Sequence, residues 1–232
     1  FFPQFHAREH LNVAYWMKAL QSQHPHIMLG FNNRFYILDK ATHPAIEHSC
    51  TSAHYPKSHE EFLLIREALE DGLNIFEDIF GFRSSSFTGT GYIWNSDFEN
   101  VLSNGGVKYL KGLLVQMNPD YRTEKMKKKY HFTGQKNRYG QTHLVRNAFF
   151  EPGLSSKNSD TVEECLSRIR FAFKSKKPAI ISTHRINYIG FINENFRKKN
   201  LELLNLLLKK ITTEFSDVEF LTTDELGKII EE

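Results

Sequence analysis

Residues 178–188 read PAIISTHRINY, a short and almost wholly apolar run that ends in His184, Arg185 and Asn187. Such a run is typical of a strand that is covered on both faces, as in a parallel sheet. Strand-like and helix-like segments alternate around it from residue 80 onward. This alternation predicts an α/β fold with parallel strands, either a barrel or a doubly wound sheet.

The elements expected on each side of this run follow from hydrophobic periodicity and turn residues. We predict helices over residues 61–80, 97–103, 161–175 and 200–211, and strands over 84–88, 107–114, 142–150, 178–183 and 218–221. A capping box from Thr222 to Glu225 predicts one more helix. Residues 30–59 and 118–139 break the alternation, and we expect them to be long loops of a single domain over residues 1–232.

Composition excludes several classes of protein. The chain has 232 residues, of which 40% are hydrophobic and 25% charged, as in a globular protein. Thirty basic against 27 acidic residues leave a charge of +3, too small to predict nucleic acid as the main partner. The apolar runs over 203–208 and 179–182 are far shorter than the roughly 18–20 residues that span a bilayer, so no membrane segment is expected. The absence of a signal pattern favours the cytoplasm, although the sequence does not determine the compartment.

The strongest local signal for chemistry is His6-Ala-Arg-Glu-His10. In a helical turn this spacing places both imidazoles on one face, where they can bind one metal ion, although two solvated histidines at a helix start would read the same. His-x-x-Glu-His is also the inverted zinc-protease motif, with Glu9 as general base. The protease motif needs a long regular helix, whereas Pro3 and the extended residues 1–5 indicate a strand that gives way to a helix.

Two strand ends supply the other candidates. His184 follows the apolar strand, at the edge of a parallel sheet where catalytic groups collect, and Asn187 and Tyr188 come directly after it. The strand over 142–150 ends in Asn147 and Glu151, which could contact substrate or orient a histidine. Six further histidines have no fixed spacing, and we treat them as loop residues: His24, His26, His43, His48, His54 and His59.

The order of these motifs resembles the polysaccharide deacetylase superfamily, metal-dependent carbohydrate esterases on an irregular (β/α)7 barrel. The closer resemblance is to a bacterial branch of polysaccharide (de)acetylase-like proteins, and it covers nearly the whole chain. The strings that carry it are PQFHAREHLNV (3–13), GFRSSSF (81–87), RNAFFEP (146–152), KPAIISTHRINYIG (177–190) and DVEFLTTDELG (217–227).

The resemblance implies a role for some residues of this sequence. His6 and His10 match the two metal-binding histidines, and His184 matches the histidine that acts as general acid. The implied cofactor is a divalent metal, zinc by preference, and the implied partner is an acetylated carbohydrate. Arg83 matches the arginine motif only loosely. Trp94 and Tyr188, with Phe87 and Tyr92, could offer apolar faces to a sugar ring, although a plain core position explains Phe87 better.

The aspartate pair that supplies the third metal ligand and the general base in this superfamily is missing from the 232 residues. We therefore expect an incomplete barrel that lacks its N-terminal strands, with an open edge near residues 1–5 and no appreciable hydrolysis by these residues alone. Two alternatives to a deacetylase stay open at this point. One is a non-catalytic carbohydrate-binding relative of the barrel, and the other is a zinc protease on residues 6–10.

Overall fold

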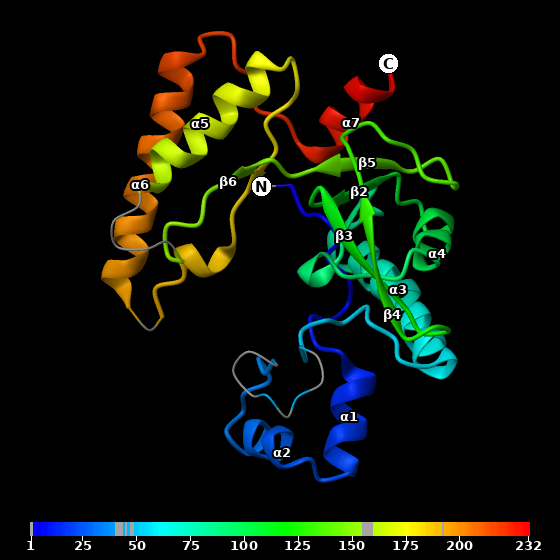
Figure 1. Cartoon of the computed structure of the whole chain (residues 1–232). Helices are drawn as coiled ribbons and strands as arrows, with labels where there is room; N and C mark the ends of the chain where they lie inside the picture. Colours follow the sequence, from blue (N-terminus) through cyan, green and yellow to red (C-terminus); the bar gives the residue numbers. More distant parts are fainter. Residues whose placement is uncertain (1, 40–43, 45, 47–48, 155–159, 192) are drawn as a thin grey trace. The chain divides into compact units, whose positions relative to one another are not determined.

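The computed structural model describes residues 2–39, 44, 46, 49–154, 160–191 and 193–232 (Figure 1). These residues divide into two compact units. Unit 1 comprises the described part of Phe1–Leu144 together with Thr222–Glu232, and unit 2 comprises the described part of Val145–Leu221.

Unit 1 is a mixed α/β structure. Its elements are α1 (Val13–Gln21), α2 (Pro25–Asn32), α3 (His59–Phe80), β1 (Ser86–Thr88), the short 3-10 helix η1 (Thr90–Tyr92), α4 (Phe98–Asn104), β2 (Tyr109–Gly112), β3 (Val115–Asp120), β4 (Lys125–Tyr130), β5 (Thr142–Val145) and α7 (Thr223–Glu231). The predicted helices over 61–80 and 97–103 are therefore confirmed as α3 and α4, and the strands over 84–88 and 107–114 as β1 and β2. Helix α1 is the helix that was expected to follow the histidine motif, whereas α2 was not predicted.

A small sheet with parallel strands organises unit 1. β1 and β2 pair in parallel, from Ser86 with Tyr109 to Thr88 with Lys111, and β5 is the next strand after β2. Phe5 joins the other edge of β1 through a parallel bridge to Phe87. Parallel pairing is thus confirmed here. The sheets of the described residues are small and none of them closes into a barrel.

The core of unit 1 lies between this sheet and the helices α3 and α4. Ser58 begins α3 by accepting the backbone N–H of Glu61, and Gly81 ends it in the left-handed conformation at φ 75°. One face of α3 is apolar and buried, as the periodicity predicts. The buried residues of this core are Phe5, Phe62, Ile65, Leu69, Leu73, Phe76, Phe87, Phe98, Val101, Leu102, Val107 and Leu110.

The lysine-rich stretch within residues 118–139 is not the long loop that we expected. Residues 125–130 form β4, which pairs antiparallel with β3 over its whole length, from Val115 with Tyr130 to Asp120 with Lys125 (Figure 1). Most side chains of β4 are exposed on both faces of the strand. Its sequence, KMKKKY, therefore lacks the apolar alternation that marks a half-buried strand. Pairing with β3, which sequence periodicity does not reveal, makes it a strand, and lysines on an exposed strand oppose aggregation.

Buried polar side chains connect the β3–β4 hairpin to the rest of unit 1. Gln116 donates from Nε2 to the carbonyl oxygen of Trp94 at 2.9 Å, and its Oε1 accepts from Nε2 of His131 at 2.8 Å. The His131 ring stacks on the ring of His143, with centroids 3.8 Å apart and planes at 12°. Burial lowers the pKa of His143 to about 3, and neighbouring His131 and Lys129 add to the shift.

Unit 2 contains β6 (Ala148–Phe149), α5 (Thr161–Lys174), β7 (Ile181–Ser182), the 3-10 helix η2 (Arg185–Tyr188) and α6 (Glu194–Glu214). β6 and β7 are parallel, and α5 packs beside α6 around a second core that includes Phe150 and Leu166 (Figure 1). The predicted helices over 161–175 and 200–211 and the strand over 178–183 are confirmed, although the strand is shorter.

Two predicted strands differ in the structure. The strand over 142–150 is divided into β5 and β6. Between them, the side chain of Asn147 forms hydrogen bonds with the backbone of Pro178 and Ile180, in place of a strand neighbour, where β6 meets β7. The strand over 218–221 does not form: this segment has no ladder partner among the described residues, and Phe220 is exposed. The capping box is confirmed, because Thr222 and Glu225 make both of its hydrogen bonds at the start of α7. No helix in the described part of the chain has the length and apolar character needed to span a membrane.

We predict that unit 1 loses stability as the pH falls below the ordinary histidine pKa of 6.5, because the unfolded chain protonates His143 there while the folded state keeps it neutral down to about pH 3. The loss is roughly 1 kcal/mol per pH unit for this residue. Urea unfolding at pH 7.5 and pH 5 should show a smaller difference in H143Q than in the wild type. The exposed-site control H59Q should keep the wild-type difference, and an unchanged difference in H143Q would contradict the assignment.

Candidate functional site

The pairing of Phe5 with β1 positions His6. The backbone N–H of Thr88 donates to the carbonyl oxygen of Phe5 at 3.3 Å, so that His6 lies beyond the carboxyl end of β1. Its Nδ1 is 2.6 Å from the carbonyl oxygen of Thr88. A carbonyl oxygen can only accept, so Nδ1 carries the proton, and the neutral ring then has its lone pair on Nε2. This is the arrangement by which proteins orient metal-ligating histidines.

His10 comes near His6 without a helical turn. Residues 6–12 are not helical, and Ala7 has a φ of 67°, which turns the chain back. The imidazole centroids of His6 and His10 are 5.3 Å apart, with planes at 71°. The expected helical turn is therefore wrong. The expected location is confirmed, because the pair lies between an extended residue, Phe5, and the start of α1.

A third imidazole, His54, belongs to the same cluster. It is buried, and its Nδ1 is 3.3 Å from Oγ1 of Thr90, just beyond the end of β1. Burial lowers the pKa of His54 to about 3, and the positive charges that His6 and His10 can carry lower it further. His54 is thus neutral at neutral pH. From the sequence we expected His54 to be a loop residue, because no spacing relates it to His6 or His10.

Asn12 explains why His54 reaches this cluster. Its Nδ2 donates to the carbonyl oxygens of Ser52, at 3.1 Å, and Tyr55, at 3.0 Å, the residues that flank His54. Its Oδ1 accepts the backbone N–H of Tyr15 and so caps α1. One buried side chain therefore joins the histidine motif, the start of α1 and the segment that carries His54.

Helix α3 supports the motif from the other side. A Cβ on Gly72 would come within 2.9 Å of Cβ of Arg8, so the motif passes directly over a glycine of this helix. Arg8 forms ion pairs with Glu9 at 2.7 Å and with Asp71 at 2.6 Å. Glu9 therefore lies in an ion pair and outside any helix, whereas the zinc-protease motif needs a long regular helix.

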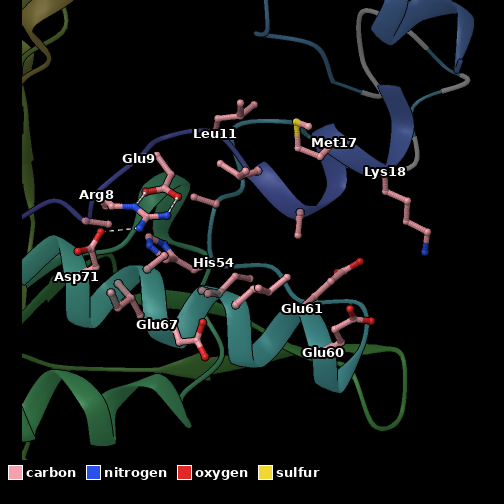
Figure 2. Close-up of a pocket in the computed structure, with 18 of the residues that line it drawn as sticks. Arg8, Glu9, Leu11, Met17, Lys18, His54, Glu60, Glu61, Glu67 and Asp71 are labelled. Carbon is pink, nitrogen blue, oxygen red and sulfur yellow. Dashed lines mark hydrogen bonds and ion pairs between the residues drawn. The ribbon is translucent and has the colours of Figure 1, made fainter. Parts of the chain in front are cut away.

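A pocket of about 640 Å³ lies beside the motif. Figure 2 shows it between the segment that carries Arg8 and Glu9, together with α1, on one side and α3 on the other. His54 is one of its lining residues. Apolar side chains such as Met17 and Leu64 line it as well, and acidic residues of α3 add carboxylates. The volume is within the range of roughly 300–1,000 Å³ that is usual for small-molecule sites.

In unit 2, His184 forms a dyad with Glu151. The ring Nδ1 is 2.6 Å from Oε1 of Glu151, and the backbone N–H of His184 lies 3.4 Å from Oε2. Asn187 is buried and donates from Nδ2 to Oε2 of Glu151 at 2.7 Å, while its Oδ1 accepts the backbone N–H of Gly153 at 2.9 Å. The carboxylate is thus held in place, and it fixes the orientation of the imidazole. The structure brings these three predicted residues together.

The remaining candidates have other contacts. Arg83 pairs with Glu77 at 2.6 Å, near the end of α3. The side-chain amide of Asn147 binds the backbone near β7, where its Nδ2 donates to the Pro178 carbonyl oxygen and its Oδ1 accepts the N–H of Ile180. Trp94 is 2% exposed and packs against Phe87, so neither is an open platform for a sugar ring. The hydroxyl of half-buried Tyr188 lies 2.9 Å from Oγ1 of Thr183, next to the dyad.

His43 and His48 lie outside the described residues. His6 and His10 belong to unit 1 and His184 to unit 2, so a shared cleft stays a prediction. Among the described residues, no three His, Cys, Asp or Glu side chains form a group that could hold a metal ion.

Comparison with known proteins finds no family model that matches the chain. No curated protein matches it either.

We predict that His6 is the tautomer with its proton on Nδ1, because the Thr88 carbonyl can only accept. Two-bond ¹H–¹⁵N correlation spectra of histidine-labelled protein at pH 8 should show a protonated Nδ1 and an unprotonated Nε2 for this ring. Assignment uses H6Q, which removes the signals in question. A His6 signal with the proton on Nε2 would contradict the geometry.

Proposed function

We propose that this protein is a metal-dependent hydrolase that removes acetyl groups from an N- or O-acetylated glycan, as its resemblance to polysaccharide deacetylases implies. The observation that carries the proposal is the pair His6 and His10, in which the Thr88 carbonyl leaves the lone pair of His6 on Nε2. In this proposal the sheet of Phe5, β1, β2 and β5 is part of an irregular (β/α)7 barrel, and the histidines lie at the carboxyl ends of its parallel strands.

The residues fit a divalent cation, for which zinc is the best candidate. Imidazole nitrogen is a preferred zinc ligand, and His6 and His10 would hold the ion. His54 beside them is neutral, so it does not bring a positive charge that would repel a cation. The resemblance assigns the third ligand and the general base to aspartates upstream. A bound zinc ion supplies Lewis acidity, which makes water a better nucleophile and polarises the acetyl carbonyl.

The pocket beside the motif is the proposed position of the substrate. Its apolar side chains on α1 and α3 can exclude water from an acetyl group and from the C–H face of a sugar ring. His54 lines this pocket and also neighbours His6 and His10, so the pocket and the pair have a side chain in common.

His184 is the proposed proton donor to the departing amine or alkoxide. Glu151 accepts the Nδ1–H of the ring and fixes its orientation, and the ring then donates the proton from Nε2. Asn187 keeps the carboxylate in this position. Since 57% of the His184 side chain is exposed, against 19% for Glu151, the ring can reach a substrate while its partner stays fixed.

We predict that the purified protein binds one zinc ion and that H6A and H10A each weaken binding at least about 10-fold, because each removes one imidazole ligand. Titration with Zn²⁺, followed by calorimetry and by metal analysis after dialysis, measures this. H59A, which removes an exposed histidine of α3, should bind zinc like the wild type. Equal zinc affinity in all four proteins would rule out the pair as the metal site.

We also predict that E151Q lowers kcat for acetate release from an N-acetylglucosamine oligomer by about 10- to 100-fold in the full-length protein, since the carboxylate that orients the His184 ring is lost. H184A should lower kcat by about 100-fold or more. Zinc binding should stay unchanged in both variants. E164Q, an exposed carboxylate of α5, is the matched control. Full activity in H184A would exclude His184 as the proton donor.

A further inference from the structure

A second pocket of unit 1 lies away from the histidine motif. It has a volume of about 410 Å³ and is formed by the start of α4, the end of β4 and the segment from His131 to His143. It has no residue in common with the pocket of Figure 2. Nothing in the proposed hydrolysis uses it.

The unusual member of this pocket is His143. Its side chain lines the pocket, the residue is only 3% exposed, and no hydrogen bond of its imidazole is found in the described parts of the chain. Its contact is the face-to-face stack on His131, whose Nε2 donates to Gln116 and whose Nδ1 is 3.1 Å from Oε1 of Gln135. These contacts hold the His131 ring in place, so that His143 stacks on a fixed ring. An imidazole that has no hydrogen-bond partner among the described residues and borders a pocket can form hydrogen bonds with a ligand.

The charges of the pocket balance. Lys129 donates to Oγ of Ser96 at 2.7 Å, and Arg138 pairs with Asp97 at 2.9 Å. Glu99 accepts from Nδ2 of Asn137 at 2.8 Å and from the indole N–H of Trp94 at 3.3 Å. Two positive and two negative side chains thus line the pocket, and each has a partner. A charged ligand would meet a like charge, whereas an uncharged ligand would not.

The groups that remain for a ligand suit a sugar. The neutral ring of His143 offers one donor and one acceptor, and Nε2 of Gln135, whose Oε1 already contacts His131, lies beside it. Tyr130 lines the pocket with a ring that is 66% exposed, and an aromatic face packs well against the C–H face of a pyranose. The combination of several hydrogen-bonding groups with one open aromatic ring selects a polyhydroxylated molecule.

We propose that this pocket binds one uncharged pyranose unit of a glycan, hydrogen-bonded to His143 and stacked on Tyr130. The ligand class follows from the lining residues of this pocket and does not depend on the deacetylase proposal. The site would hold a glycan chain at a position separate from His6 and His10.

The test is a titration of the full-length protein with the N-acetylglucosamine trimer, followed by ¹H–¹⁵N spectra of the backbone and of the histidine rings. We expect saturable shifts at His131 and His143, and at least 10-fold weaker binding of the charged sugars glucosamine and glucuronic acid. Y130A should weaken trimer binding at least 10-fold. F132A is the matched control, because Phe132 is 65% exposed on the same segment and does not line the pocket.

Each other outcome would overturn the inference. These outcomes are no shifts with the trimer or with glucose, shifts confined to residues around His6, tighter binding of a charged sugar, and equal affinity in Y130A and F132A. Because H143Q could disturb the fold, Y130A, on an exposed side chain, is the decisive variant. Trimer binding that persists in H6A, together with loss of zinc binding there, would separate this site from the proposed catalytic one.

Discussion

The parallel pairing of Phe5 with Phe87 is the constraint on which the candidate site depends. Phe5 is 2% exposed in the core of unit 1, and its backbone binds Ser84 on one side of the residue and Thr88 on the other. Because the pairing fixes the register, His6 must lie against the carbonyl oxygen of Thr88, and the tautomer of its ring follows. If the pairing with β1 slipped by one residue, Phe5 would leave the core and His6 would enter it. The free-energy cost of exposing the Phe5 ring to water therefore maintains the geometry of the site.

Histidines with different partners have different chemistry in this chain. His6 donates from Nδ1 to a carbonyl oxygen, which places the lone pair of the neutral ring on Nε2, and burial lowers the pKa of His54 to about 3. His184 lies against the carboxylate of Glu151, which fixes the orientation of its ring. His143 stacks on another imidazole, and burial keeps it neutral. The partner of each ring, and not the residue type, decides which role it can serve.

Two polar side chains connect segments that are distant in sequence and position the chemical groups. Asn12 binds the carbonyl oxygen of Tyr55, 43 residues away, and so brings His54 to the motif. In unit 2, Asn187 binds Glu151, 36 residues away, and orients the carboxylate of the dyad. Both asparagines are buried, where an unpaired amide would be costly, so each fixes one local arrangement of loops that would otherwise have several. Loop segments can thus carry a defined site.

The sequence by itself determined the features that depend on nearby residues. The end of α3 follows from Gly81, although the helix begins at His59 and not at residue 61. The start of α7 follows from the capping box at Thr222, and the strand that precedes His184 follows from its apolar run. A helix closes its hydrogen bonds within four residues, so its pattern is local. Only the tertiary structure decided that lysine-rich residues 125–130 are a strand, that residues 142–150 divide between two sheets, and that His54 joins His6 and His10. Strand pairing and burial depend on partners that are distant in the chain, and neither composition nor spacing identifies those partners.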